Sequence, residues 1–379
     1  MLNLVRRLLY RRSYPLNKIT ISREKLLHNY KYLSSLNRKT RIAPVLKSNA
    51  YGHGIQGVGK MMDKVGAPFL AVDSIYEAYQ LQKAGVKSSV LIMGYIDPQS
   101  LSYKKLPFQY AVYDLKLAQA INKHQKGAKV HVFLDTGMHR EGVPVKDLEK
   151  FLLELKKLPN INIVGLMSHF AIGNEPKNPL TLKQVRQFTK AVELCKSLKI
   201  KLEYKHLGGT NAALHVKPEI CNVIRVGMGL YGIDPGKQIL KQVQDGSLKP
   251  TLKVSTKIVQ IKQISKSDKV GYGGSFMAKK QMIIGILPFG YFDGLDRRLS
   301  NKGLVLVDGQ VCKILGFASM NMTTVDLSKV KNPHVGQEVI IFSDNPSDPN
   351  SLVNAAKQAQ TTVYDLLVHL ASSTRREVI

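Results

Sequence analysis

The sequence contains no tryptophan, few cysteines and no long apolar run. The three cysteines, Cys195, Cys221 and Cys312, show no C-x-x-C spacing, so they indicate neither a zinc site nor a disulfide framework. No apolar run reaches the roughly 18 to 20 residues that a membrane-spanning helix requires. The sequence therefore predicts a cytoplasmic protein that neither spans a membrane nor binds a metal.

Acidic residues are also scarce, with 27 Asp and Glu against 56 Lys and Arg, which gives a formal net charge of +29. A charge of this size is typical of proteins that bind nucleic acid or anionic membranes. The basic residues are spread along the whole chain, however, and no nucleic-acid-binding motif is present. We therefore expect a general attraction to anions and no specific nucleic-acid partner.

The N-terminal segment, MLNLVRRLLYRRSYPLN, mixes basic and apolar residues. It lacks the apolar core of about 7 to 15 residues that a secretory signal carries. We interpret residues 1–18 as an arm that precedes a first strand at residues 19–22.

The chain is long enough for two domains, or for one barrel with an appendage. Short β-branched runs alternate with amphipathic, helix-like segments over its first two thirds. These runs lie at residues 42–46, 68–73, 89–94, 110–114, 129–135, 162–168, 202–208 and 222–227. Such alternation predicts a parallel sheet, and eight units predict a closed (β/α)₈ barrel of the TIM type at residues 19–248.

The pattern changes after Pro250, where runs of alternating polar and apolar residues replace the helix-like segments. The Asp308-Gly309 pair is a strong hairpin signal. We predict a mainly β C-terminal domain at residues 249–379, which closes with one helical segment at residues 352–371.

Polar residues follow the apolar runs of the predicted barrel, where the active site of such a fold lies. They include Lys47, Asp135 to Gly137, Arg140, Ser168, His169, Gly208 to Asn211, Arg225 and Gly227. A lysine at a strand end is more often a surface or salt-bridging residue, but burial lowers its pKa and makes it nucleophilic toward an aldehyde. Glycine-rich turns after the last two strands offer backbone N–H groups to a phosphate. Together these features point to pyridoxal 5'-phosphate (PLP), which needs both.

The motifs around these residues resemble those of the alanine racemase family, in the family's order and nearly from end to end. They read PVLKSNAYGHG (44–54), LDTGMHREGV (134–143), GLMSHFA (165–171), IRVGMGLYG (224–232), VGYGGSF (270–276), ILPFGYFDG (286–294) and GFASMNMTTVD (316–326). The resemblance implies a PLP-binding barrel followed by a β domain, and a head-to-tail homodimer with shared active sites. It also implies an isomerase that interconverts L-alanine and D-alanine through a PLP aldimine and supplies D-alanine for peptidoglycan.

The resemblance also implies roles for individual residues. Lys47 and the partner subunit's Tyr272 would be the two catalytic bases, one on each face of the substrate Cα. His169 would hydrogen-bond both that tyrosine and Arg225, which faces the pyridine nitrogen. Arg140 and Met320 would lie beside the substrate. The residues implied to bind the cofactor are Lys47, Tyr51, His169, Asn211, Arg225, Gly227 and Met228.

The sequence departs from the family pattern at several positions. Phe133 stands where many members have a carbamylated lysine that orients the arginine matching Arg140. Asn321 replaces an aspartate at the active-site entrance, and Val378 aligns with a tyrosine that helps to hold the phosphate. Two alternatives therefore stay open: a racemase of another small amino acid such as serine, and a non-catalytic PLP-binding protein. A fold-related decarboxylase is less consistent with the motifs around Tyr272.

Overall fold

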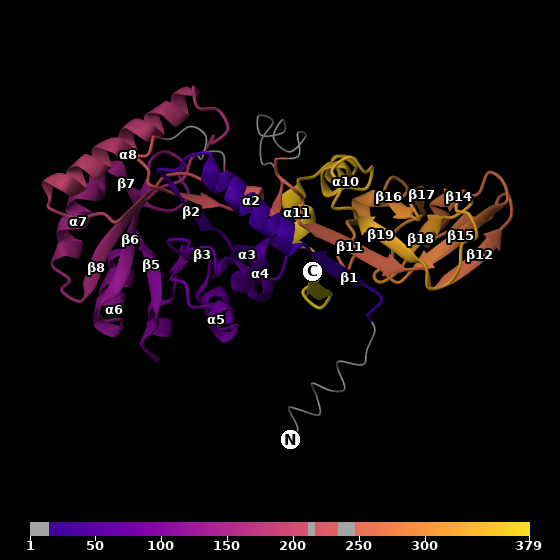
Figure 1. Ribbon diagram of the computed structural model, residues 1–379, viewed down its shortest axis with the longest axis horizontal. Coiled ribbons are helices and arrows are strands. Elements are labelled where there is room, and N and C mark those ends of the chain that lie inside the picture. Colours follow the sequence, from indigo (N-terminus) through magenta and orange to yellow (C-terminus); the bar gives the residue numbers. More distant parts are fainter. Residues whose placement is uncertain (1–14, 211–216, 234–246) are drawn as a thin grey trace, which may run out of the picture. The chain divides into compact units, whose positions relative to one another are not determined.

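The computed structural model in Figure 1 describes residues 15–210, 217–233 and 247–379. Contacts divide the chain into two compact units. One comprises Arg23–Lys249, and the other combines the residues up to Ser22 with Pro250–Ile379. Asn211, an expected cofactor ligand, lies outside the described residues.

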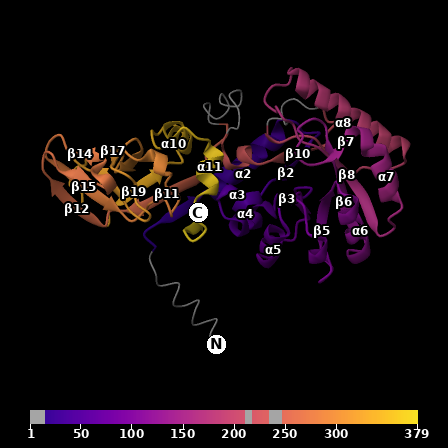
Figure 2. The ribbon, with the colours of Figure 1, turned by 180° about the vertical axis from the view of Figure 1, so that it is seen from behind.

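The first unit contains a ring of parallel strands. They are β2 (Arg41–Pro44), β3 (Leu70–Val72), β4 (Val90–Ile92), β5 (Phe108–Val112), β6 (Ala128–Asp135), β8 (Ile161–Met167), β9 (Tyr204–His206) and β10 (Val223–Val226). Strands β3, β4, β5, β6, β8 and β9 pair in that order, and β10 pairs with β2. Figure 2 shows β10 beside β2.

Two further contacts close the ring. A bridge between Val45 and Ala71 joins β2 to β3, and the Arg225 N–H donates to the Gly208 carbonyl at 3.1 Å to join β10 to β9. These eight strands match the eight runs found in the sequence, so the predicted (β/α)₈ barrel is confirmed. The short strand β7 (Val143–Pro144) adds to β6 outside the ring.

Helices follow most of the strands, and α6, α7 and α8 lie along the outer side of β5, β6 and β8 (Figure 1). The helices of this unit are α2 (Arg23–Ser35), α3 (Lys47–Tyr51), α4 (Ile55–Met62), α5 (Ile75–Lys83), α6 (Leu115–His124), α7 (Leu148–Lys156) and α8 (Pro179–Ser197). Polar caps fix several starts: Ser74 accepts from the Glu77 N–H, and Asp114 from the Leu117 N–H. Capping explains why α5 and α6 begin directly after their strands.

The second unit is built on a nine-stranded mixed sheet. In spatial order its strands are β12 (Gln260–Ile264), β15 (Met282–Leu287), β18 (Thr323–Asp326), β17 (Gln310–Leu315), β16 (Leu304–Val307), β19 (Glu338–Phe342), β11 (Leu252–Lys257), β1 (Lys18–Ile21) and β20 (Arg375–Val378). Asp308 and Gly309 both have positive φ between β16 and β17, which confirms the predicted hairpin. A small pair, β13 (Lys269–Val270) and β14 (Phe276–Met277), lies apart from this sheet.

Two local expectations differ from the structure. The first strand, which the sequence analysis placed at the start of the barrel, lies in the β-rich unit between β11 and β20, with Ile19 and Ile21 fully buried there. The chain therefore enters the barrel unit only at Arg23. The single helical segment expected near the C-terminus is split into α10 (Leu352–Ala359) and α11 (Val363–Val368), because Gln360 adopts a left-handed conformation.

Candidate active site

Lys47 lies directly beyond the end of β2, between two neighbouring strands. The Val45 N–H donates to the Val226 carbonyl at 2.8 Å, and the Leu46 N–H donates to the Ala71 carbonyl at 2.7 Å. These bonds extend the sheet pairing up to the residue before Lys47. The strand end therefore fixes the backbone from which the lysine projects.

The turn after Lys47 has an unusual backbone. Ser48, Asn49, Ala50 and Tyr51 all have φ between 51° and 54°, in the left-handed region. This conformation costs a residue other than glycine roughly 1–2 kcal/mol. Four such residues in a row store strain, and strain of this kind persists only where the surroundings enforce it.

Several hydrogen bonds hold the left-handed turn in place. The Asn49 N–H donates to Glu77 Oε1 at 3.2 Å, and Asn49 Oδ1 accepts from the Ile55 N–H at 2.9 Å. Gly52 and Gly54 continue with positive φ, which glycine adopts without strain. The motif that follows Lys47 in the sequence thus folds into a rigid turn between β2 and α4.

Tyr51 reaches from this turn to Gly227, which follows β10. A Cβ atom added at Gly227 would lie 2.5 Å from Tyr51 Oη, so only glycine fits there. Met228, the next residue, is buried and begins the short helix η4 (Met228–Tyr231). Tyr51, Gly227 and Met228, three expected cofactor contacts, are therefore brought together at one place on the rim.

Gly227→Ala is expected to weaken PLP binding by about tenfold or more, because the new methyl group must displace the Tyr51 hydroxyl. Titrating the apoprotein with PLP and following fluorescence would measure the change. Gly127→Ala is the control, since Gly127 precedes β6 at the opposite end of the barrel and a Cβ atom there would meet no atom within 4 Å. Equal affinities for Gly227→Ala and the unaltered protein would contradict the expectation.

Arg225 is 4% exposed and makes four side-chain hydrogen bonds. Its Nη2 donates to the Ser168 carbonyl at 2.6 Å and to His169 Nδ1 at 3.0 Å. Its Nη1 donates to the His206 carbonyl at 2.8 Å and to His206 Nδ1 at 2.7 Å. Burial lowers the pKa of Arg225 to about 10, which leaves the guanidinium cationic at neutral pH.

His169 is a neutral side chain at the end of β8. Burial, and then the charges of Arg225, Arg140 and Lys47, lower its pKa to about 3. Because its Nδ1 accepts from an arginine, the neutral ring carries its proton on Nε2. Gln184 donates to the His169 carbonyl at 2.8 Å and thereby holds this strand end against α8.

Two buried histidines that the sequence analysis did not consider lie behind Arg225. His206 is on β9 and His131 is on β6, and both are fully buried. Burial also lowers the pKa of His131 to about 3 and places the pKa of His206 well below its ordinary value. The only sequence signal is the place of His131 among the apolar residues of β6, and β9, which reads YKH, gives none for His206.

The buried histidines make the protein acid-sensitive. Their ordinary pKa is 6.5, and that of His131 and of His169 is about 3 in the folded chain. Below pH 6.5 the unfolded chain takes up protons that the folded chain excludes, so stability present above that pH is lost as the pH falls. Each histidine contributes a loss of about 1.4 kcal/mol per pH unit.

Urea unfolding of the apoprotein at pH 7.5, 6 and 5 tests this expectation, in a range where few carboxylates titrate. The free energy of unfolding should fall steadily with pH. His131→Gln should flatten the dependence, and His124→Gln should leave it unchanged. A stability that is constant from pH 7.5 to 5 would contradict the assignment of neutral buried rings.

Arg140 lies in the loop after β6, half exposed, and pairs with its neighbour Glu141. Its Nη2 donates to Glu141 Oε1 at 2.6 Å, and its Nε donates to Oε2. This bonding raises the pKa of Arg140. Phe133 is buried in an apolar cluster with Ala111 and Met167, so it forms no ion pair with Arg140. In this chain the acidic partner of Arg140 is its neighbour Glu141.

Tyr272 and Met320 belong to the β-rich unit. Tyr272 begins the turn η5 (Tyr272–Gly274) and is 72% exposed, and Met320 is 54% exposed. The Phe317 N–H donates to Ser275 Oγ at 3.0 Å, which ties the Tyr272 turn to the segment that leads to Met320. Both residues therefore lie at the same end of this unit.

The GYFDG motif explains the position of Met320. The Phe292 N–H donates to the Met320 carbonyl at 2.9 Å, and a Cβ atom at Gly290 would lie 2.4 Å from that carbonyl oxygen. Asp293 Oδ2 accepts from the Gly290 N–H at 3.0 Å and closes the motif's turn. The motif serves as a rigid backbone support in this unit.

The described residues contain no group of three or more His, Cys, Asp or Glu side chains that could hold a metal ion. Within the same ranges, no helix has the length and apolarity needed to cross a membrane.

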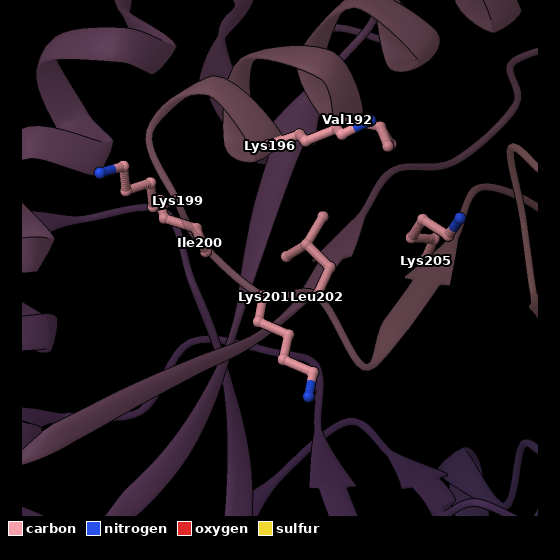
Figure 3. A pocket seen from close by; sticks show the side chains of 7 residues that line it. All are labelled: Val192, Lys196, Lys199, Ile200, Lys201, Leu202 and Lys205. Carbon is pink, nitrogen blue, oxygen red and sulfur yellow. The ribbon is translucent and has the colours of Figure 1, made fainter.

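A hollow lies between the end of α8 and the start of β9, at the end of the barrel opposite the rim that carries Lys47 (Figure 3). Its lining includes Lys196, Lys199, Lys201 and Lys205. The ammonium groups of Lys199, Lys201 and Lys205 point in different directions in Figure 3, and Lys205 donates to the Glu219 carbonyl. The hollow reflects the general positive charge and offers no convergent anion site.

A strand-end lysine, a buried cationic arginine and a tyrosine hydroxyl packed against a rim glycine, on a closed barrel, define the class of barrel enzymes that use PLP. The family follows from the sequence. Residues 21–235 match the model of the alanine racemase N-terminal domain, and residues 251–378 match that of the alanine racemase C-terminal domain. The chain belongs to the alanine racemase family, whose members are PLP-dependent amino-acid racemases.

Individual relatives agree. Alanine racemase 1 of Caldanaerobacter subterraneus is 30% identical over 366 residues, which cover 95% of this chain and 94% of that protein. Alanine racemase of Sorangium cellulosum is 33% identical over 80% of this chain and 81% of its own length. The solved alanine racemase of Clostridium difficile 630 superposes with a TM-score of 0.89 at 28% identity, covering 97% of both chains. PLP is thus the cofactor, and the chain is an isomerase.

Proposed function

We propose that this chain interconverts L-alanine and D-alanine with PLP attached to Lys47, and that Lys47 and the partner subunit's Tyr272 are the two bases. The observation that carries the proposal is the rim arrangement in which Tyr51 packs against Gly227 while Arg225 is hydrogen-bonded to His169, whose pKa the charge of Lys47 also lowers. PLP, when bound, withdraws electrons from the substrate Cα and so acidifies its proton. The protein's own side chains supply the binding, the orientation and the proton transfers.

The residues present fit PLP. Tyr51 and Gly227 would hold the phosphate, because the missing side chain at Gly227 lets the Tyr51 hydroxyl lie directly against the backbone there. Arg225 would face the pyridine nitrogen. Its four Nη hydrogens are already engaged, which leaves Nε–H as the donor toward a ligand. A guanidinium keeps its proton, so the ring would stay a weak electron sink and side reactions would be limited.

His169 would prepare the second base. Its Nδ1 accepts from Arg225, so the ring proton is on Nε2. This Nε2–H would donate a hydrogen bond to the hydroxyl oxygen of the partner subunit's Tyr272. Tyrosine has an ordinary pKa near 10 and needs such a donor to act as a base. Because Arg225 donates to the other ring nitrogen of His169, it keeps the His169 Nε2–H as the donor toward that tyrosine.

Arg140 would bind the substrate carboxylate. It is half exposed in the loop after β6, and a bidentate pair with Glu141 fixes its guanidinium. Met320 of the partner subunit would narrow the entrance. Asn321, which is neutral, would leave that entrance without the aspartate common in the family.

Exposed apolar side chains support a head-to-tail homodimer. These side chains belong to the β-rich unit, where hydrogen bonds link Ser275 to Phe317 and Phe292 to Met320, and they comprise Tyr272, Met277, Tyr291, Phe292, Phe317, Met320 and Met322. Exposed patches of this kind usually mark an interaction surface. A second copy of the chain is the partner we propose, and its Tyr272 would complete the site at Lys47. The enzyme would work in the cytoplasm and supply D-alanine for peptidoglycan.

The test is α-proton exchange. The purified protein with PLP is incubated in D₂O with a panel of L-amino acids, and both deuterium uptake and formation of the D-enantiomer are followed. D-alanine should appear fastest. Faster turnover of serine, which the neutral Asn321 favours, would change the substrate and keep the mechanism, and bound PLP without any exchange would indicate a binding protein.

A further inference from the structure

A line of buried polar side chains runs from Arg225 into the middle of the barrel. Arg225 Nη1 lies 2.7 Å from His206 Nδ1, His206 Nε2 lies 2.8 Å from His131 Nδ1, and His131 Nε2 lies 2.7 Å from Gln109 Oε1. All four side chains are buried. We refer to Arg225, His206, His131 and Gln109 as the histidine relay.

The relay has one direction. Arginine can only donate, so His206 Nδ1 must accept and its proton must be on Nε2. His131 Nδ1 then accepts from His206, and its own Nε2–H donates to the Gln109 carbonyl oxygen. A proton added to either ring would set two donors against each other. Both histidines are therefore neutral, with the proton on Nε2.

The barrel is shaped to hold these rings. A Cβ atom at Gly165 would lie 2.2 Å from His131 Nδ1, so the neighbouring strand β8 has no room for a side chain there. The pairing of β6 with β8 slips by one residue at this point, and His131 pairs with Gly165. The Phe69 ring packs 5.4 Å from both imidazoles. The His131 and His206 rings are therefore held in place by the backbone of β8 at Gly165 and by the Phe69 ring.

The far end of the relay is also anchored. Tyr204 stacks on His131 with ring centroids 5.3 Å apart. Burial and hydrogen bonding to Glu203 raise the pKa of Tyr204 to about 12, whereas hydrogen bonding to Gln109 lowers it. A Gln109 amide that donates to Tyr204 keeps its carbonyl oxygen toward His131. The line thus begins at a cation that only donates and ends near the Glu203 carboxylate, which accepts.

We propose that His206 and His131 are positioning residues whose one-way hydrogen-bond chain to Gln109 fixes the orientation of the Arg225 guanidinium. The proposal deepens the proposed function, since it rests on Arg225 acting at the cofactor. With both Nη groups engaged, the guanidinium presents one defined edge to its ligand. Breaking the chain leaves the charge in place and releases its orientation.

The first test uses apoprotein labelled with ¹⁵N-histidine. Long-range ¹H–¹⁵N spectra at pH 7 report the tautomer of each ring, and His131→Gln and His206→Gln assign the signals. Both rings should be neutral with the proton on Nε2. A proton on Nδ1, or a cationic ring, would overturn the proposal. Because no cofactor is present, this result is independent of whether PLP binds at Lys47.

The second test compares two substitutions at one position. Glutamine in His131→Gln can accept from His206 and donate to Gln109, whereas phenylalanine in His131→Phe can do neither. His131→Phe leaves the His206 Nε2–H without an acceptor, so the Arg225 guanidinium should lose its fixed orientation. Its separate Nη–H signals in ¹⁵N-arginine spectra should merge, and PLP should bind about ten- to a hundredfold more weakly. His131→Gln should keep the separate Nη–H signals and bind PLP within about threefold of the unaltered protein.

A role limited to packing predicts separate Arg225 Nη–H signals in both variants, and that result would contradict the proposal. Gln109→Met is the second variant if His131→Phe does not fold. It removes the terminal acceptor at similar volume and should likewise merge the Arg225 Nη–H signals. Unchanged Arg225 signals in Gln109→Met would equally count against the relay.

Discussion

Lys47→Ala is expected to abolish covalent attachment of PLP and to lower alanine racemisation by about four orders of magnitude or more. The substitution removes both the amine that holds the cofactor and one of the two bases, and a positioned proton-transfer group alone contributes about 10²- to 10⁴-fold. The left-handed turn at residues 48–51 positions this one lysine, so no neighbour can replace it. Borohydride reduction with PLP, followed by peptide mapping, identifies the modified residue.

Lys64→Ala is the matched control, because Lys64 is an exposed lysine of the same unit. It should retain full PLP attachment and full activity. Covalent PLP on the reduced Lys47→Ala protein, mapped to another lysine with racemisation preserved, would show that the strand-end lysine has been misassigned.

Tyr272→Phe is the substitution with the second largest expected effect. Racemisation should fall by about 10²- to 10⁴-fold, because the hydroxyl is the proposed base on one face of the substrate. The loss should be one-sided. In D₂O, α-proton exchange should persist for the enantiomer whose proton faces Lys47 and vanish for the other, with PLP binding unchanged.

Tyr364→Phe serves as the control, since Tyr364 is another exposed tyrosine of the β-rich unit, on α11, and is not among the residues of the proposed interface. It should exchange the α-proton of both enantiomers at the normal rate. If Tyr272→Phe slowed exchange equally for both enantiomers, Tyr272 would have a general structural role and the two-base assignment would fail.

Much of the fold was predictable because its patterns are local. Most barrel strands are short buried runs followed by a helix, several of these helices begin at a polar cap, and the Asp308-Gly309 hairpin depends on two adjacent residues. The candidate site was predictable for a similar reason. Parallel strands deliver their carboxyl ends to one rim, so Lys47, His169 and Arg225 could be grouped from their places at the ends of apolar runs.

The remaining features depend on distant pairing. Strand β1 has only four residues, too few for their polar–apolar alternation to assign it to a unit, and its pairing with β11 and β20, far along the chain, places it in the β-rich unit. His131 and His206 stand within strands that otherwise read as core, and their hydrogen bond joins residues 75 positions apart. Glu141 was overlooked although it adjoins Arg140, because a surface ion pair has no distinctive sequence pattern.

The central claim is that each active site combines Lys47 of one subunit with Tyr272 of the other, and hybrid dimers test it most directly. Subunits carrying Lys47→Ala are mixed with subunits carrying Tyr272→Phe, refolded together and assayed for racemisation. Each protein alone is expected to be inactive, but a mixed dimer has one site with both residues intact. Random pairing makes half of the dimers mixed, so activity should return to about a quarter of that of the unaltered enzyme. If the mixture stays as inactive as its two components although mixed dimers form, the two bases come from the same chain and the account is contradicted.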